Sequence, residues 1–346
     1  MNNKETICAV VVTYNRKKLL LECLESLRKQ SWPLDAIYLI DNASTDGTSK
    51  LLLEYGYINE IQPNLNKDWE KSVTITNITD GTNLKFHYVR MHENTGGAGG
   101  FHEGVKKAYE KGYNWLWLMD DDAEPDENAL KKLTRYFNED NVSAFASVVK
   151  NINGEIEGHS AYRDFRRKYR SFYIPLENKE YFNNLKIDVD FTSFVGILIN
   201  RSMIKKIGFP KKEFFIHGDD ADYCIRLNEH GRILLVTGSY ITHKYISSYI
   251  PIKKIGRLHY AKRPFSNYWL FYYTTRNAIW FGKTYSINRI LFYINVLFDY
   301  LKHLIGIIVF DDHKLKRTNM ITNAYLDGLK GIFDNDKPKR ILYNDN

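Results

Sequence analysis

Three adjacent carboxylates, Asp120, Asp121 and Asp122, directly follow the apolar, aromatic segment 115–119. Carboxylates placed this close repel one another, and each favours its protonated form unless a cation lies among them. Hard carboxylate oxygens favour Mn²⁺ or Mg²⁺, and such ions commonly bind phosphate oxygens as well. The pattern therefore predicts a metal and diphosphate site at the carboxyl end of a strand. Asp120 and Asp122 can converge on one ion, whereas Asp121 is predicted to contact a sugar or ribose.

A second acidic cluster, Asp219, Asp220 and Asp222, lies at the start of a predicted helix over residues 219–229. Transfer of a group to a hydroxyl needs a general base, and a positioned carboxylate can fill that role. The competing interpretation is helix capping, in which the carboxylates only offset the helix dipole. We interpret Asp220 as the base. His243 follows a strand farther along the chain, and it is either a structural histidine or an additional metal ligand.

Two neighbouring strand ends carry the residue types of a nucleotide site. Asp41 follows the apolar strand 37–40, where its carboxylate can accept the imide N–H of a uracil or thymine ring. The competing interpretation is that the turn after Asp41 only caps the next helix. Thr13, Asn15 and Arg16 end the preceding strand, so the four residues together predict a nucleotide pocket.

A glycine-rich turn at residues 94–100 opens a predicted helix that runs through Tyr109. Such a turn lets the backbone approach a phosphate at a helix N-terminus, although this one matches neither GxGxxG nor a P-loop. Glycine turns are also often structural. We interpret this turn as a wall of the donor pocket near the sugar, with Asn94 and Gly97 as the contacts.

The elements around these motifs alternate between strand and helix. Apolar runs at 7–12 and 37–40 are typical of buried parallel strands, and leucines at helical spacing lie between them. This order predicts an α/β fold with a mostly parallel central sheet. Further expected elements are a hairpin at 73–76 and 84–89, a helix at 125–137, a basic loop at 160–186, strands at 191–199 and 232–236, and a helical, aromatic and basic region from about residue 257.

Composition narrows the class of partner. The 346 residues carry a net charge of +8 and are 14% aromatic, which suits phosphate-bearing substrates, an anionic membrane surface or nucleic acid. Three cysteines without metal-ligand spacing predict reduced thiols in a cytoplasmic protein. No uninterrupted apolar run reaches 18 residues, so segment 287–310 is expected to be an amphipathic or oligomer-facing helix. The basic, aromatic segment 253–269 suits peripheral membrane association or a lipid-diphosphate acceptor, or else is an ordinary solvated face.

These motifs, in this order, resemble the glycosyltransferase family 2 enzymes, which are inverting transferases with the GT-A fold. The resemblance covers about residues 5–245 and rests on segments 11–16 (VVTYNR), 40–48 (IDNASTDGT), 119–122 (MDDD) and 218–226 (GDDADYCIR). It implies a Rossmann-like catalytic domain over residues 1–250 and a helical region over 251–346 for acceptor, membrane or oligomer contacts. It places the base-binding carboxylate at Asp41, the metal-binding pair at Asp120 and Asp122, the catalytic base at Asp220 and a late metal ligand at His243.

A narrower likeness is to bacterial galactofuranosyl- and rhamnosyltransferases, whose donors are UDP-galactofuranose and dTDP-rhamnose. It rests on residues 94–101, the aspartate triplet, and segments 273–277 (YTTRN) and 324–331 (AYLDGLKG). It implies inverting displacement at the anomeric carbon, a Mn²⁺ or Mg²⁺ cofactor, and a glycan or lipid-diphosphate-linked acceptor. The polar stretch 59–85 departs from the pattern by its length.

Two other classes stay open. The first is a nucleic-acid-binding protein, which the positive charge suits but the acidic strand ends oppose, so no nucleic-acid partner is expected. The second is a nucleotidyltransferase, which also uses carboxylates and Mg²⁺. The sequence lacks the glycine-rich, lysine-bearing triphosphate loop of that class.

Overall fold

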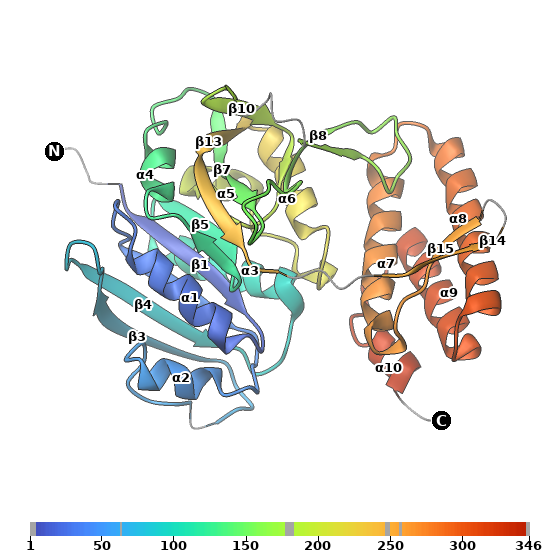
Figure 1. Cartoon of the computed structure of the whole chain (residues 1–346), viewed down its shortest axis with the longest axis horizontal. Helices are drawn as coiled ribbons and strands as arrows, with labels where there is room; N and C mark the ends of the chain where they lie inside the picture. Colours follow the sequence, from blue (N-terminus) through green and yellow to red (C-terminus); the bar gives the residue numbers. More distant parts are fainter. Residues whose placement is uncertain (1–4, 63, 177–182, 246–249, 256–257, 344–346) are drawn as a thin grey trace. The chain divides into compact units, whose positions relative to one another are not determined.

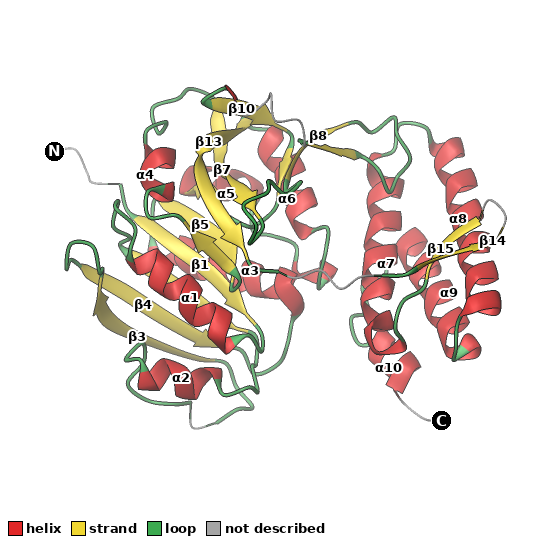
Figure 2. Ribbon diagram, in the orientation of Figure 1, coloured by secondary structure: helices red, strands yellow, loops and turns green. Residues whose placement is uncertain are grey.

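A computed structural model describes residues 5–62, 64–176, 183–245, 250–255 and 258–343. The chain divides into two compact units, drawn in Figure 1 and Figure 2. The first unit comprises Met1–Tyr162, Pro175–Lys212 and Asp219–Tyr245. The second comprises Arg163–Ile174, Glu213–Gly218 and Ile246–Asn346. Two short segments from the first 250 residues therefore belong to the second unit.

A ten-stranded mixed sheet forms the centre of the first unit. Its strands are β1 (Ile7–Thr13), β2 (Ala36–Asp41), β3 (Trp69–Thr76), β4 (Asn83–Arg90), β5 (Trp115–Asp120), β6 (Ala123–Pro125), β7 (Val142–Lys150), β10 (Lys186–Val189), β12 (Ile197–Asn200) and β13 (Arg232–His243). The order is β10-β13-β7-β12-β5-β1-β2-β4-β3, with β6 paired to β13. The strands that carry the predicted nucleotide and metal residues, β2, β1 and β5, are adjacent and parallel. Their carboxyl ends therefore meet at one edge of the sheet.

Helices cover both faces of this sheet. Alternate residues of β1 point to opposite faces, so Ile7, Ala9 and Val11 join one apolar core while Cys8 and Val10 join another. The first core includes α1 (Lys17–Arg28), α2 (Thr48–Glu54) and α4 (Ala129–Thr134). The second includes α3 (Gly96–Lys111), α5 (Arg201–Ile207) and α6 (Asp219–Asn228). Burial on both faces explains why the strand sequences are continuously apolar.

Gly104 lets α3 approach the sheet closely. A Cβ at this position would lie 2.4 Å from Val10 Cγ1 and 3.0 Å from Ile40 Cγ1, both in the core. Gly104→Ala is therefore expected to lower the free energy of unfolding by about 1–3 kcal/mol, measured by urea denaturation. Gly97→Ala is the matched control, because its Cβ would meet nothing within 4 Å. Equal losses of stability in the two variants would contradict the close approach.

Four of the expected elements can be compared directly with the structure. The hairpin at 73–76 and 84–89 is confirmed as β3 and β4, and β4 also extends the parallel sheet beside β2. The expected helix over 125–137 is wrong at both ends, because residues 123–125 pair with β13 and α4 spans only Ala129–Thr134. Segment 191–199 forms two strands, β11 (Phe191–Thr192) and β12, because Gly196 between them adopts φ +91°. The expected loop 160–186 includes the short strands β8 (Ser160–Arg163) and β9 (Tyr173–Pro175) and the start of β10.

The second unit is mainly helical, as expected from the sequence. Its elements are the hairpin β14 (Ile252–Ile255) and β15 (Leu258–Ala261), and helices α7 (Tyr268–Tyr285), α8 (Arg289–Phe310), α9 (Lys314–Lys330) and α10 (Lys337–Tyr343). Helix α7 packs closely on α9, because a Cβ at Gly328 would lie 2.7 Å from the carbonyl oxygen of Arg276. Between the same helices, the Tyr272 hydroxyl donates to Asp327, which also accepts from Lys337. Close backbone packing and paired polar side chains thus hold α7 and α9 together.

Two buried side chains of α7 hold the segment Glu213–Gly218. Asn277 Nδ2 lies within 3.0 Å of the carbonyl oxygens of Phe214, Ile216 and His217. Arg276 Nη2 donates to the carbonyl of Phe214 at 2.9 Å. The backbone needs this support because Phe215 and His217 have positive φ values of 64° and 65°, which side-chain-bearing residues rarely adopt. The chain leaves this segment directly into the acidic start of α6.

Candidate active site

The predicted metal and nucleotide residues meet at the carboxyl edge of the parallel strands. In the sheet register, Thr13 pairs with Asp41 on one side, and Val12 pairs with Asp120 on the other. The end of β1 therefore lies between the two acidic strand ends. This is the arrangement that the order of the motifs predicts.

Asp121 is a buried residue that fixes the end of β1. One carboxylate oxygen accepts from Thr13 Oγ1 at 2.6 Å and from the backbone N–H of Tyr14 at 3.3 Å. The other lies 3.4 Å from Arg16 Nη1. These contacts give Asp121 a structural role in the site. Its predicted contact with a sugar or ribose stays a prediction.

Asp122 and His243 meet at the ends of different elements. His243 Nε2 lies 3.4 Å from Asp122 Oδ1, and His243 Nδ1 lies 3.0 Å from Glu157. Glu157 also lies 3.2 Å from His159 Nε2. The ligand atoms of Glu157, His159 and His243 all lie within 4.8 Å of one another, so they too could hold a metal ion. The sequence analysis did not identify Glu157 and His159 as possible metal ligands. The one indication in the sequence is that two ligand-type residues lie two positions apart, just before β8.

The charges at this edge are unevenly compensated. Burial, followed by the charges of Asp122 and Asp121, raises the pKa of Asp120 to about 8. Burial also raises the pKa of Asp121 to about 6, although Thr13 and Arg16 oppose the shift. Burial alone would raise the pKa of Asp122, but the hydrogen bond and charge of His243, together with Arg16, lower it. Asp120 therefore lacks an adequate cationic partner, whereas Asp122 has two.

The donor set fits a divalent cation. Asp122 Oδ2 is paired with Arg16 Nη1 at 2.5 Å, whereas the contact of the buried Asp122 Oδ1 with His243 Nε2 is long, at 3.4 Å. A buried carboxylate oxygen that is poorly satisfied is costly unless an ion or a ligand completes it. Asp120, Asp122 and His243 together offer the oxygen and imidazole ligands that suit Mn²⁺ or Mg²⁺.

Asp41 lies at the centre of a hydrogen-bonded turn after β2. Its side chain is completely buried, and it accepts from the backbone N–H of Ser44 at 2.7 Å and from the Tyr88 hydroxyl at 2.6 Å. Asn15 adopts φ +57°, and its Oδ1 accepts from the backbone N–H of Thr45 at 2.7 Å. Asp41 and Asn15 thus shape the loop between β2 and α2. The recognition of a base by this loop stays a prediction.

In the glycine-rich start of α3, one glycine packs against β1 and another leaves the backbone accessible to a ligand. A Cβ at Gly100 would lie 2.5 Å from Val12 Cγ1, so this glycine allows close packing on β1. Gly97 has open space around its Cα, and Asn94 is exposed with its Oδ1 bonded to Gly96 N–H at 2.8 Å. The two residues predicted to contact the donor are therefore the accessible ones.

The acidic start of α6 contains three carboxylates in different environments. Asp222 is fully buried and pairs with Lys211 at 2.7 Å and Arg226 at 2.8 Å, which is a structural role. Burial, then the charges of Asp220 and Asp120, raises the pKa of Asp219 well above its usual range. Asp220 is only partly buried, and its Oδ1 accepts from the N–H of Ala221. Among the three, Asp220 is thus the carboxylate best suited to accept a proton from a substrate.

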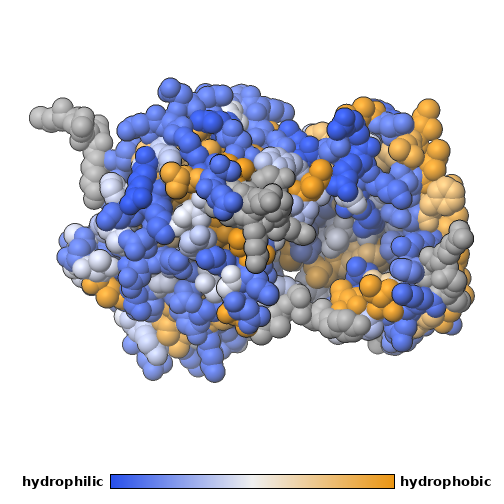
Figure 3. All heavy atoms as spheres, turned by 45° about the horizontal axis from the view of Figure 1, so that its top comes forward, coloured by the Kyte–Doolittle hydropathy of each residue, from blue (hydrophilic) through white to orange (hydrophobic). Residues whose placement is uncertain are grey.

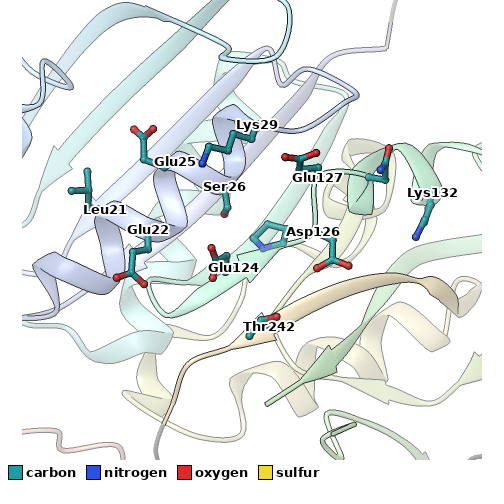
Figure 4. Close-up of a pocket in the computed structure, with 12 residues that line it drawn as sticks. Leu21, Glu22, Glu25, Ser26, Lys29, Glu124, Asp126, Glu127, Lys132 and Thr242 are labelled. Carbon is teal, nitrogen blue, oxygen red and sulfur yellow. The ribbon is translucent and has the colours of Figure 1, made fainter. Parts of the chain in front are cut away.

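A separate cavity of about 690 Å³ lies beside α1, β6 and α4 (Figure 4). Its lining includes Glu22, Glu25, Glu124 and Lys132. It contains none of the predicted site residues. The predicted metal and nucleotide residues instead lie at the carboxyl edge of the sheet.

The family assignment comes from a comparison with known sequences. The profile described as "Glycosyl transferase family 2" matches residues 8–208, which is more than half of the chain. The chain belongs to glycosyl transferase family 2. The matched part includes both strand ends with Asp41 and the aspartate triplet, and the sequence prediction of a glycosyltransferase is confirmed.

Relatives of this glycosyltransferase include enzymes named for two different sugars. Galactofuranosyltransferase GlfT1 of Mycolicibacterium smegmatis is 24% identical over 257 residues, covering 71% of this chain and 72% of the relative. The dTDP-rhamnosyl transferase RfbF of Shigella flexneri is 23% identical over 260 residues, covering 72% and 80%.

Solved structures confirm the GT-A fold of this glycosyltransferase. S. aureus TarS 1–349 has a TM-score of 0.51 and 14% identity, covering 97% of this chain and 86% of that chain. GalNAc-T7, solved with UDP, GalNAc and Mn²⁺, has a TM-score of 0.58 and 13% identity, covering 96% and 57%. At these identities the likeness extends to the fold alone.

Proposed function

We propose that this glycosyltransferase moves galactofuranose from UDP-galactofuranose to a hydroxyl of a bacterial cell-surface glycan or lipid-linked precursor, with inversion at the anomeric carbon. The observation that carries the proposal is the likeness to a galactofuranosyltransferase over 71% of the chain. The exposed Asn94 and the open backbone at Gly97 support a donor pocket beside Asp120 and Asp122, the proposed metal ligands.

Each residue of the site has a proposed task. The turn held by Asp41 and Asn15 receives the nucleoside, and Arg16 faces the diphosphate. A divalent cation held by Asp120, Asp122 and His243, when bound, would offset charge on the departing nucleoside diphosphate. Asp220 accepts the proton of the acceptor hydroxyl as its oxygen bonds to the anomeric carbon and the bond from that carbon to the diphosphate oxygen breaks.

A second candidate donor is dTDP-rhamnose. The likeness to a dTDP-rhamnosyl transferase covers 72% of the chain, nearly the same share as the first relative. Uracil and thymine present the same imide N–H, so the turn at Asp41 suits either nucleotide. The sugar pocket therefore decides between the two donors.

A donor screen tests the proposal. UDP-galactofuranose, dTDP-rhamnose, UDP-galactose and UDP-glucose are each incubated with the protein and Mn²⁺, and slow donor hydrolysis and binding are measured. We expect UDP-galactofuranose to give the highest kcat/KM for hydrolysis. Preference for dTDP-rhamnose would replace the first proposal with the second. Release of diphosphate from a nucleoside triphosphate and a sugar phosphate would instead identify a nucleotidyltransferase.

A further inference from the structure

Helix α8 exposes an apolar face along its whole length. Ten apolar or aromatic side chains between Ile290 and Val309 are each 43–75% exposed. Six of them follow one another at intervals of three or four residues, which places them on one side of the helix. These six, named the α8 stripe below, are Ile290, Ile294, Leu297, Leu301, Ile305 and Ile308. The stripe is about 27 Å long, from the rise of 1.5 Å per residue.

The opposite face of α8 is the more polar one. Asp299 accepts from the Tyr169 hydroxyl at 3.0 Å, the Tyr300 hydroxyl bonds to Thr322 at 2.9 Å, and His303 Nδ1 lies 3.0 Å from the Tyr325 hydroxyl. A surface helix of a water-soluble protein normally buries its apolar side and exposes its polar side. In α8 the inward side combines these polar contacts with buried Phe292, Val296 and Ile307, while the outward side is also apolar. Figure 3 shows hydrophobic side chains gathered on the surface of the second unit.

The same region carries the positive charge of the chain. Residues 246–346 contain 16 Lys and Arg against 7 Asp and Glu, a net charge of +9. Residues 1–245 therefore carry −1 of the total of +8. Arg289 and Lys302 are exposed on α8 itself. Lys253 and Lys254 are exposed on the hairpin whose Tyr260 ring packs against Gly306 of α8.

We propose that the α8 stripe is a docking surface for the face of an anionic lipid bilayer. Apolar side chains can enter the boundary between headgroups and acyl chains, while the surrounding cations contact acidic headgroups. A second copy of the chain is a poorer occupant, because two regions of charge +9 would repel each other.

A membrane-spanning role fits the contacts less well. By length and composition α8 is the one helix among the described residues that could cross a membrane, and most of it is exposed. However, its other face packs on α9 and on the hairpin of β14 and β15. Only one side of α8, the side of the stripe, faces outward, so the helix is expected to lie in the plane of the membrane surface.

Vesicle flotation tests this surface. The full chain is mixed, without donor, with vesicles of phosphatidylcholine alone or with one third phosphatidylglycerol. The stripe variant Ile294→Gln, Leu297→Gln, Leu301→Gln is expected to reduce partitioning to the anionic vesicles by at least about 100-fold. The matched control Leu65→Gln, Ile152→Gln, Leu185→Gln removes three apolar side chains of equal or greater exposure from the first unit and should partition like the wild type.

A second pair of variants tests whether the lysines beside the α8 stripe contribute to binding of anionic vesicles. Lys253→Gln with Lys254→Gln should weaken partitioning about fivefold per lysine, whereas Lys205→Gln with Lys206→Gln, exposed on α5, should not. Equal partitioning of the stripe variant and its control, or equal binding to neutral and anionic vesicles, would overturn the proposal. A wild-type dimer that the stripe variant converts to monomer, with vesicle binding unchanged, would assign the stripe to a second copy. Because no donor is present, these results are independent of the proposed transfer.

Discussion

Replacing Asp220 with asparagine is expected to lower the rate of sugar transfer by about 10²–10⁴-fold while leaving the affinity for the nucleoside diphosphate nearly unchanged. Asparagine has nearly the same shape but does not accept the proton of the acceptor hydroxyl. Asp220 is the partly buried carboxylate of its cluster, so it is the member that an acceptor can reach. Release of UDP measures transfer, and calorimetric titration with UDP and Mn²⁺ measures binding.

Two neighbouring variants serve as controls for this prediction. Asp219→Asn should keep most of the activity, because Asp219 is buried and its raised pKa shows that this site disfavours the charge that a general base needs. Asp222→Asn should instead lower the free energy of unfolding by about 3–5 kcal/mol, because it breaks a buried ion pair with Arg226 and Lys211. An active Asp220→Asn protein beside an inactive Asp219→Asn protein would move the base to Asp219.

Replacing Asp122 with asparagine is expected to weaken Mn²⁺ binding by about 100-fold or more and to reduce transfer at least as strongly. The change removes the negative charge from a buried carboxylate whose Oδ1 makes only a long contact, at 3.4 Å, with His243 Nε2 among the described residues. Direct titration of Mn²⁺, followed by electron paramagnetic resonance, measures the affinity. Glu127→Gln is the control, because Glu127 lines the separate cavity, so its affinity for Mn²⁺ should match that of the wild type.

The pH dependence of metal binding extends this prediction. The pKa of Asp120 is raised to about 8, so this carboxyl holds a proton at neutral pH, and a metal ion must displace it. Mn²⁺ affinity should therefore rise with pH through neutrality and level off above about pH 8. An affinity for Mn²⁺ that is independent of pH between 6 and 8 would show that Asp120 is not a ligand.

The sequence predicted that the acidic and polar strand ends would lie together, because strand ends can be recognised in a single sequence. Asp41, Thr13 and Asp120 each follow a continuous apolar run, and parallel strands bring such positions to one edge. The sequence did not indicate that Asp41 is bonded to Tyr88, because that contact depends on the register of β2 with β4. Glu157 lies in a segment without regular periodicity, so nothing in the sequence placed it beside His243.

The outward face of α8 was beyond sequence reasoning for a different reason. Helical spacing identifies which residues share a side, but it does not say whether that side meets protein or solvent. Asp299, Tyr300 and His303 look like the solvent side of an ordinary helix. In the structure they are the side that bonds to Tyr169, Thr322 and Tyr325.

The interleaved chain path limits how this enzyme can be cut and recombined. Segment Glu213–Gly218 belongs to the helical unit but continues directly into α6 and its acidic start. A fragment ending at residue 250 would keep Phe214, which is fully buried, but lose Asn277 and Arg276, which hold its carbonyl. Exchanging C-terminal regions between relatives to alter acceptor choice would therefore also disturb the approach to the proposed base. Successful chimaeras should transfer residues 163–174 and 213–218 together with the C-terminal helices.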